Sequence, residues 1–211
     1  WNWFKHPDAK FCKKLVFNGA RNSEEYLNFI SKNSDSYLIQ EKLFSLDKRK
    51  TIVIILGHFG DGSKSSKYRN KLLYEVLTAL RDIELNIIMK PHVFCDMDLV
   101  RSIVKKSKYK SDRVYCTRIH PHILQKISIG GLFINNSSVR CDYKCTNFPV
   151  ITYNGGVEDE VVLDSCSGIV CADKRQLINS LELLMKKPEK SMPKEGKGLI
   201  NSCEKIENLF N

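Results

Sequence analysis

Residues 131–153 read GLFINNSSVRCDYKCTNFPVITY, and this stretch decides the fold class. An apolar run at 132–134 breaks into a polar turn at 135–138, a short helix-compatible segment follows, and a second apolar run starts after Pro149. The order is therefore strand, polar turn, helix, strand. In an open α/β sheet such a turn lies at the carboxyl end of its strand, where these sheets bind ligands. Small hydroxyl residues that open a helix offer side-chain donors and free backbone N–H groups, which suit a phosphate.

The same alternation of apolar runs and helical patterns extends over most of the chain. It predicts an α/β, Rossmann-like fold with a mainly parallel sheet and helices on both faces. We divide the chain into 1–49 (a linker or the edge of a missing amino-terminal domain), 50–186 (the Rossmann-like domain) and 187–211 (a helical tail). The expected strands are 14–17, 51–56, 85–89, 113–116, 132–135, 150–153 and 168–171, and the expected helices are 23–31, 68–83, 96–106, 120–127, 138–144, 174–186 and 198–210.

Composition indicates an ordinary globular protein with a basic surface. The 211 residues include 42% hydrophobic ones, the net charge is +10 and the pI is about 9.2. Such a surface favours anionic partners, among them nucleotides, nucleic acid, acidic glycans and anionic lipid. No apolar stretch approaches the ~20 residues of a membrane-spanning helix. The start at Trp1 is not a signal peptide, and the absence of an initiator Met indicates a fragment or a processed form.

The eight cysteines show no metal-binding spacing, because no C-x-x-C pair exists and the closest pair is Cys141 and Cys145. Several of them, such as Cys116 and Cys171, sit inside predicted apolar strands. Disulfides remain an alternative, but the pattern favours buried, reduced thiols of a cytosolic protein.

Polar turns follow four of the predicted strands, so we expect their side chains to gather along one edge of the sheet. Glycines in the first turn let the backbone approach a ligand closely. A lysine and a histidine in the second can meet a phosphate. A fifth turn offers a carboxylate for sugar or ribose hydroxyls. The candidate ligand-binding residues are Gly57, Gly60, Asp61, Ser63, Lys90, His92, His120, Asn136, Ser137, Ser138 and Glu158.

Each of these candidates also has a purely structural interpretation. The turn at 57–63 matches neither a Walker loop nor G-x-G-x-x-G, so it is equally well a flexible connection. His92 is also suited to capping a loop, and His120, which precedes a proline, to starting a helix. The serine pair alone would be a helix cap, and Glu158 a charged surface loop.

The spacing of these motifs resembles the carboxyl-terminal half of a GT-B glycosyltransferase. In particular it is similar to bacterial capsule and surface-polysaccharide enzymes that use CMP- or CDP-linked donors, such as Kdo transferases, polysialyltransferases and CDP-glycerol transferases. The matching pieces are 55–57 with Asp61 and Ser63, then 90–92, and then 136–139 followed by 148–151. The family pattern is not complete, since Val93 stands where a second proline is often found and residues 140–142 replace small and acidic residues.

The resemblance implies that Lys90, His92, Ser137 and Ser138 bind the phosphate of a nucleotide-sugar donor, with residues 50–186 as the donor-binding domain. These groups would stabilise the charge that grows on the leaving nucleotide without a metal ion or other cofactor. The implied function is a nucleotide-sugar-dependent glycosyltransferase of surface polysaccharide or glycan synthesis, cytoplasmic and compatible with the cytoplasmic face of a membrane. The glycan acceptor's general base would come from the missing amino-terminal domain, so catalysis by this chain alone stays open.

Two alternatives remain. One is half of a sugar-nucleotide epimerase, which shares the same architecture. The other is a non-enzymatic module that binds nucleic acid or another anionic partner, as the net charge of +10 would allow. Nucleic acid ranks last, because basic and aromatic residues interleave only at 108–110.

Overall fold

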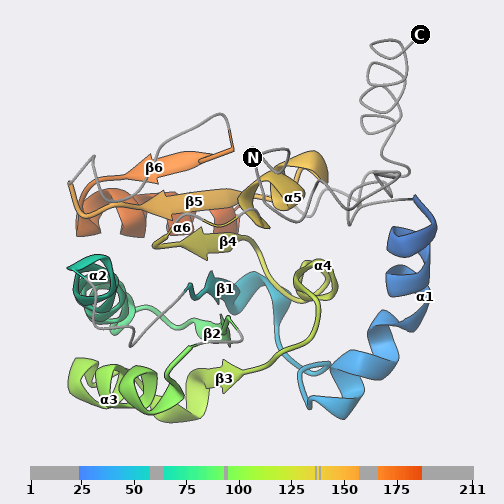
Figure 1. The fold of residues 1–211 in the computed structure, drawn as a ribbon, viewed down its shortest axis with the longest axis horizontal. Helices are drawn as coiled ribbons and strands as arrows, with labels where there is room; N and C mark the ends of the chain where they lie inside the picture. Colours follow the sequence, from blue (N-terminus) through green and yellow to red (C-terminus); the bar gives the residue numbers. More distant parts are fainter. Residues whose placement is uncertain are drawn as a thin grey trace, which may run out of the picture.

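The computed structural model describes residues 24–57, 64–92, 95–135, 137, 139–156 and 166–186. Within these residues six strands form one sheet of order β3-β2-β1-β4-β5-β6, in which every neighbouring pair is parallel (Figure 1). The Rossmann-like α/β prediction is therefore confirmed. The strands are β1 (Thr51–Ile55), β2 (Asn86–Lys90), β3 (Val114–Cys116), β4 (Gly131–Phe133), β5 (Val150–Tyr153) and β6 (Ile169–Cys171).

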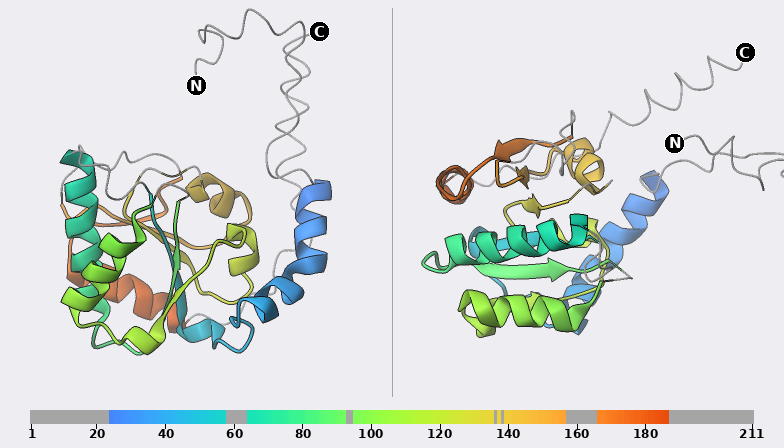
Figure 2. Two further views of the ribbon diagram at one scale, coloured as in Figure 1. Left: turned by 60° about the horizontal axis from the view of Figure 1, so that its bottom comes forward. Right: turned by 60° about the vertical axis from the view of Figure 1, so that its left-hand side comes forward.

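Helices cover both faces of the sheet, as Figures 1 and 2 show. The helices α2, α3 and α6 share one apolar core with the sheet, and α1, α4 and α5 lie over a second core on the other face. Alternate strand residues divide between the two, because side chains along a strand point to opposite faces: Ile52 and Ile54 enter the first core, Val53 and Ile55 the second. The helices are α1 (Glu24–Gln40), α2 (Lys64–Leu80), α3 (Met97–Ser107), α4 (Pro121–Leu124), α5 (Val139–Cys145) and α6 (Lys174–Lys186), and two 3₁₀ turns are η3 (Lys48–Lys50) and η4 (Ser111–Arg113).

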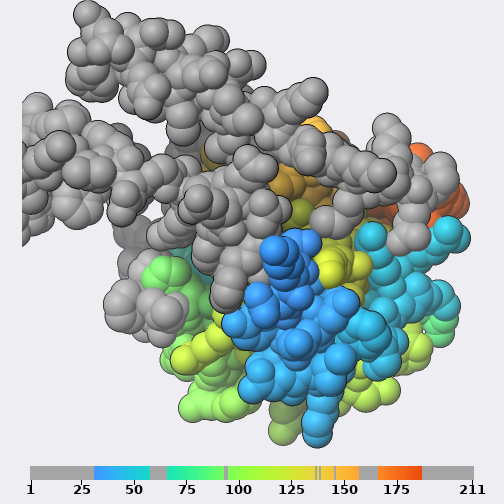
Figure 3. Space-filling model, turned by 90° about the vertical axis from the view of Figure 1, so that its right-hand side faces the viewer, coloured from blue at the N-terminus to red at the C-terminus, as the bar shows by residue number. Residues whose placement is uncertain are grey.

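Helix α1 and the turns that follow it make up much of the face seen in Figure 3. Leu38 and Leu43 anchor this part of the chain, since both are buried in the core that α4 and α5 share. On its outer side Ile39 and Phe44 are exposed. In the part of the chain that the structure describes, no helix is long and apolar enough to cross a membrane.

Two elements have the bounds that the sequence predicted, and others differ at one or both ends. Strand β5 and helix α6 have the predicted bounds, and Asp96 caps α3, accepting hydrogen bonds from the N–H groups of Asp98 and Leu99. Helix α2 lies at 64–80 instead of 68–83, and α1 continues to residue 40 instead of ending at 31. The predicted strand at 14–17 and the predicted helix at 198–210 lie outside the described residues.

The helix predicted at 120–127 is only half as long as expected. Only Pro121–Leu124 is α-helical, and His120 is its N-cap. The N–H groups of Lys126 and Ile127 bond to the carbonyls of Ile123 and Leu124, three residues back, at 3.2 Å in both cases. Such bonds wind the chain more tightly than an α-helix does and end it early.

The strand order reverses between β1 and β4. In doubly wound sheets the crevice at the carboxyl ends of two such strands is the usual ligand-binding position. Here the sequence continues from β1 into Leu56 and Gly57 and from β4 into Ile134 and Asn135. This switch point is therefore the expected position of a ligand-binding site.

Candidate functional site

The sheet register brings three of the sequence motifs to one edge. Ile55 of β1 lies level with Lys90 of β2 on one side and with Phe133 of β4 on the other. The N–H of Leu56 also donates to the carbonyl of Lys90 at 3.0 Å. Because neighbouring strands lie about 4.8 Å apart, the ends of β2 and β4 are separated by about 10 Å, with β1 between them. Lys90, Gly57 and the turn after β4 thus belong to the same carboxyl edge.

Gly57 and Asn135 meet at the centre of this edge. A Cβ atom added to Gly57 would lie 3.0 Å from the Asn135 Cγ and closer still to Nδ2, so only glycine leaves room for this amide. The Asn135 Nδ2 donates to the carbonyl oxygen of Ile55 at 3.3 Å, and the side chain is 5% exposed. Asn135 therefore joins the ends of β1 and β4 across the switch point. Sequence reasoning placed it in the turn but did not single it out.

Lys90 is half-buried at the end of β2. Burial lowers the pKa of its ammonium group, the neighbouring Arg118 guanidinium lowers that pKa further, and the Cys116 thiol acts in the opposite direction. Both effects disfavour the charged form, so a bound anion would relieve them. Arg118 follows β3, is exposed, and was not among the predicted site residues.

Cys116, at the end of β3, was expected to be buried in its strand, and this was wrong. Its side chain is exposed, and among the described residues β3 is an edge strand with no neighbour on one side. Nearby atoms still desolvate the thiol enough to raise its pKa, although Arg101 and Arg118 counteract that effect. A thiol with a raised pKa is a weak nucleophile at neutral pH.

The two predicted histidine positions have different surroundings. His92 is half-buried two residues beyond Lys90, and its carbonyl accepts the N–H of Cys95 at 3.0 Å. His120 caps α4, with its Nδ1 accepting the N–H of His122 at 3.4 Å and its ring stacked on that of His122 at 5.1 Å. The geometry of His120 thus fits the helix-start interpretation, whereas His92 follows the end of β2 by two residues.

Ser137 lies at the start of α5. Its hydroxyl oxygen accepts the N–H of Val139 at 3.3 Å, and its carbonyl accepts the N–H of Arg140 at 3.1 Å. It therefore caps the helix, which does not prevent its hydroxyl proton from meeting a ligand. Because α5 has only seven residues, its dipole contributes less to an anion site than a long helix would.

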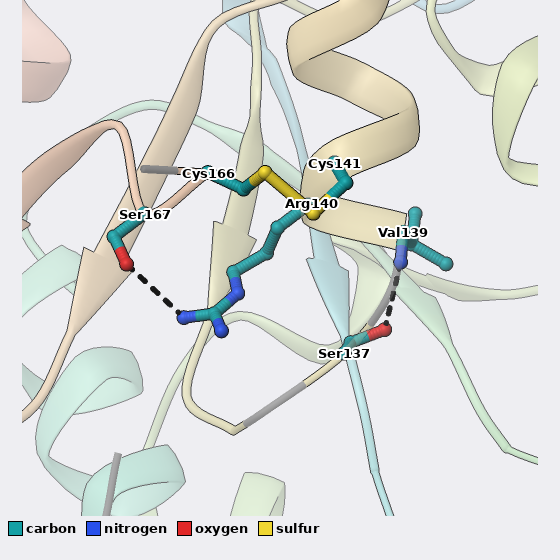
Figure 4. The surroundings of a disulfide bond; sticks show 6 residues. All are labelled: Ser137, Val139, Arg140, Cys141, Cys166 and Ser167. Atoms are coloured by element: carbon teal, nitrogen blue, oxygen red, sulfur yellow. Dashed lines mark hydrogen bonds between the residues drawn. A yellow bond between two sulfur atoms is a disulfide. The ribbon is translucent and has the colours of Figure 1, made fainter. Parts of the chain in front are cut away.

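Arg140 and a disulfide lie directly behind this cap, as Figure 4 shows. The Arg140 side chain is 4% exposed, and its Nη1 donates to the Ser167 Oγ at 3.4 Å. Cys141 is joined to Cys166 by a disulfide bond, so the expectation of reduced thiols is wrong for this pair. Cys171 is a buried free thiol, as expected. Neither Arg140 as a buried cation nor the pairing of these cysteines was visible in the sequence, since both depend on contact between segments about 25 residues apart.

A further polar cluster closes the carboxyl end of β5. The hydroxyl of Tyr68 in α2 donates to the carbonyl oxygen of Asn154, and the hydroxyl of Tyr153 donates to the Glu75 Oε2 at 2.9 Å. Gly155 has a φ of +59°, and a Cβ atom there would lie 2.7 Å from the Leu72 side chain. The turn after β5 is thus held against α2.

Six of the predicted site residues lie outside the described residues, so the structure gives no position for them. They are Gly60, Asp61, Ser63, Asn136, Ser138 and Glu158.

Comparison with known proteins shows a likeness in fold. No protein-family model matches the sequence, and no curated protein matches it. Among solved structures the chain is similar to UDP-GlcNAc 2-epimerase from Methanocaldococcus jannaschii, with a TM-score of 0.57 and 15% identity over 87% of this chain and 52% of that one. A structure of that epimerase in complex with UDP-GlcNAc and UDP gives the same TM-score and identity, over 87% and 51% of the two chains.

At 15% identity the likeness concerns the fold alone, and it supports the Rossmann-like α/β assignment. The chain spans about half the length of these solved structures, 52% and 51%.

Proposed function

We propose that this chain is the nucleotide-binding half of a GT-B-type enzyme and binds a nucleotide sugar at the carboxyl edge of its sheet. One observation carries the proposal. The register of β2, β1 and β4 places Lys90 on one side of the topological switch point and the turn containing Ser137 on the other. This is the position at which open α/β sheets bind nucleotides.

Charge supports a phosphate as the bound group. Lys90 is half-buried beside Arg118, and both influences on its pKa favour loss of its proton in the unliganded chain. A phosphate would stabilise the ammonium form and make a charge-assisted hydrogen bond. The Ser137 oxygen already accepts the Val139 N–H, which leaves the hydroxyl proton to donate to a phosphate oxygen. His92, two residues beyond Lys90, is proposed as a second donor.

Glycosyl transfer is the reaction that we propose from the sequence motifs. Breaking the bond between sugar and nucleotide leaves negative charge on the phosphate, and a fixed cation at Lys90 would stabilise that charge as it develops. The donor would be CMP- or CDP-linked, and the product a surface polysaccharide or other glycan. We assign no general base to the described residues, and propose that it comes from the other half of the enzyme.

A sugar-nucleotide epimerase is the second candidate. The likeness of the fold to UDP-GlcNAc 2-epimerase favours it, whereas the motifs at 90–92 and 136–139 favour the transferase. Both candidates require a nucleotide at the same edge, and they differ in the nucleotide base.

Calorimetric titration of the purified chain with CMP, CDP, UDP and UDP-GlcNAc tests the proposal. We expect binding that weakens by about tenfold or more in Lys90→Ala, because a hydrogen bond to a charged group is lost. Lys105→Ala is the matched control, since Lys105 is an exposed lysine of α3. Preference for cytidine nucleotides would support the transferase, and preference for UDP-GlcNAc the epimerase. Absence of binding to all four ligands would contradict both.

A further inference from the structure

The centre of the carboxyl edge holds a buried acceptor that lacks a donor. Asn135 is 5% exposed, and among the residues that the structure describes its Oδ1 has no hydrogen-bond partner. Leaving a buried amide oxygen unpaired costs free energy, because the oxygen gives up its hydrogen bonds to water and gains none in the protein. Buried polar atoms are therefore nearly always paired, and an exception at a binding site calls for an explanation.

The rest of the Asn135 side chain is fixed, so the oxygen cannot simply exchange places with the nitrogen. Nδ2 donates to the Ile55 carbonyl oxygen at 3.3 Å, and turning the amide over would set two oxygens against each other. The absence of a Cβ at Gly57 makes room for the amide in this position. The sheet thus holds an asparagine at the switch point although one half of its amide gains nothing in the unliganded chain.

The polarity of the edge indicates what the oxygen is for. The cation Lys90 ends β2 and the cation Arg118 follows β3, so phosphate oxygens are favoured on that side. An amide oxygen repels phosphate oxygens but accepts from a hydroxyl. The group that meets the Asn135 Oδ1 should therefore be a ligand hydroxyl, while Lys90 and Ser137 on either side meet the phosphate.

We propose that Asn135 selects the sugar part of the bound nucleotide sugar, with its Oδ1 accepting a hydrogen bond from one ring hydroxyl. The inference rests on the proposed function and adds a specificity residue to the same site. Since Oδ1 is covered in the unliganded chain, the atoms that cover it must shift as the ligand enters. The hydroxyl then supplies the missing donor, and a ligand without it leaves the oxygen unpaired.

A double-mutant-type cycle tests this inference: a hydroxyl is removed from the ligand, the Asn135 amide is removed from the protein, and the affinity of each combination is measured. The probes are UDP and CDP, their 2′-deoxy and 3′-deoxy forms, and UDP-GlcNAc, titrated into wild type and Asn135→Leu. We expect one deoxy form to bind wild type about tenfold more weakly than its parent, and Asn135→Leu to bind parent and deoxy form equally. If the hydroxyl belongs to the transferred sugar, the coupling appears between UDP-GlcNAc and UDP instead. Asn179→Leu, at an exposed position of α6, is the control.

The outcomes separate this inference from the proposed function. If wild type binds none of the probes, both fail. If wild type binds but every removed hydroxyl affects wild type and Asn135→Leu alike, only the role of Asn135 is wrong. Should Asn135→Leu not fold, the deoxy series on wild type still decides, because equal affinity for all hydroxyl patterns, with UDP-GlcNAc no tighter than UDP, would overturn the inference.

Discussion

The charge of Lys90 favours binding of a phosphate but lowers the folding stability of the unliganded chain. Burial and Arg118 lower its pKa below the ordinary value of 10.5. Between the lowered pKa and 10.5 the unfolded chain keeps a proton that the folded chain has lost, so folding stability rises with pH in that window. At neutral pH the folded chain carries the full penalty of the charge. A bound phosphate would reverse this balance.

Replacing Lys90 with methionine should therefore stabilise the unliganded chain. We expect Lys90→Met to raise the midpoint of thermal unfolding at pH 7 by about 1–2 °C, a small gain because the side chain is only half-buried. Its advantage over wild type should shrink as pH rises toward 10.5, and nucleotide binding should weaken. Thermal unfolding of both proteins at pH 7 and pH 9.5, with Lys105→Met as control, measures this. A variant less stable than wild type at pH 7 would show that the Lys90 charge is not a burden.

The sequence predicted a site residue only where it also predicted the end of the strand that precedes it. Lys90 directly follows an apolar run and Ser137 lies in the polar turn after another, and any parallel sheet brings such positions to one edge. Asn135 was not singled out because its role depends on contact with Gly57, and that contact follows from the pairing of β1 with β4. Pairing between strands about 80 residues apart leaves no local pattern in the sequence.

At the scale of the elements, α5 and the segment before β6 are joined by several contacts. The Cys141–Cys166 disulfide links them covalently, and the Thr152 hydroxyl donates to the Ser167 carbonyl oxygen at 2.7 Å. Gly168, with a φ of +66°, fits tightly against the backbone of Val150. The position of α5, which carries Ser137 at its start, therefore depends on β5 and β6 as well as on β4.

Removing this disulfide should destabilise the fold. The bond spans 25 residues of sequence, for which the loss of chain entropy in the unfolded state corresponds to roughly 3 kcal/mol. We expect the double variant Cys141→Ser/Cys166→Ser to unfold at lower denaturant concentration by that free energy, and a dithiol reductant to lower wild type to the same level. Denaturant unfolding with and without reductant measures this, and Cys116→Ser, at an exposed free thiol, serves as the control. Equal stability of wild type with and without reductant would contradict it.

The sequence predicted an element well where its burial sets its extent. It predicted an element poorly where hydrogen bonds or contacts with distant segments set its extent. Strand β1 is buried along its full length, and its apolar run predicted it. Helix α4 ends after four residues because the following N–H groups bond three residues back, which no periodicity reveals. The disulfide was missed for the same reason as Asn135, since adjacency of α5 to the end of the β5–β6 connection arises only in the folded sheet.

On the scale of the whole molecule, the chain is about half as long as the solved structures with which it shares its fold, 52% and 51%. Its sheet has an edge strand, β6, on which Ile169 and Val170 are both exposed. Its net charge is +10. A charge of that size attracts any polyanion, so nucleic-acid binding is the alternative that the whole molecule, rather than its site, suggests.

The salt dependence of binding distinguishes a nucleotide held at the site from nucleic acid held by the basic surface. A nucleotide held by one or two phosphate contacts should lose about tenfold or less in affinity between 50 and 200 mM salt, whereas a single strand held through six or more should lose about 300-fold or more. We expect the affinity for the nucleotide to depend only weakly on salt concentration. A ten-nucleotide single strand should bind weakly, and its affinity should fall steeply with salt. Titrations of both ligands at the two salt concentrations measure this. The variant Lys105→Ala/Lys106→Ala removes exposed charge from the last turn of α3. It should weaken binding of the oligonucleotide and leave the affinity for the nucleotide unchanged. An oligonucleotide that binds more tightly than every nucleotide at 200 mM salt would instead make the basic surface the functional feature of the molecule.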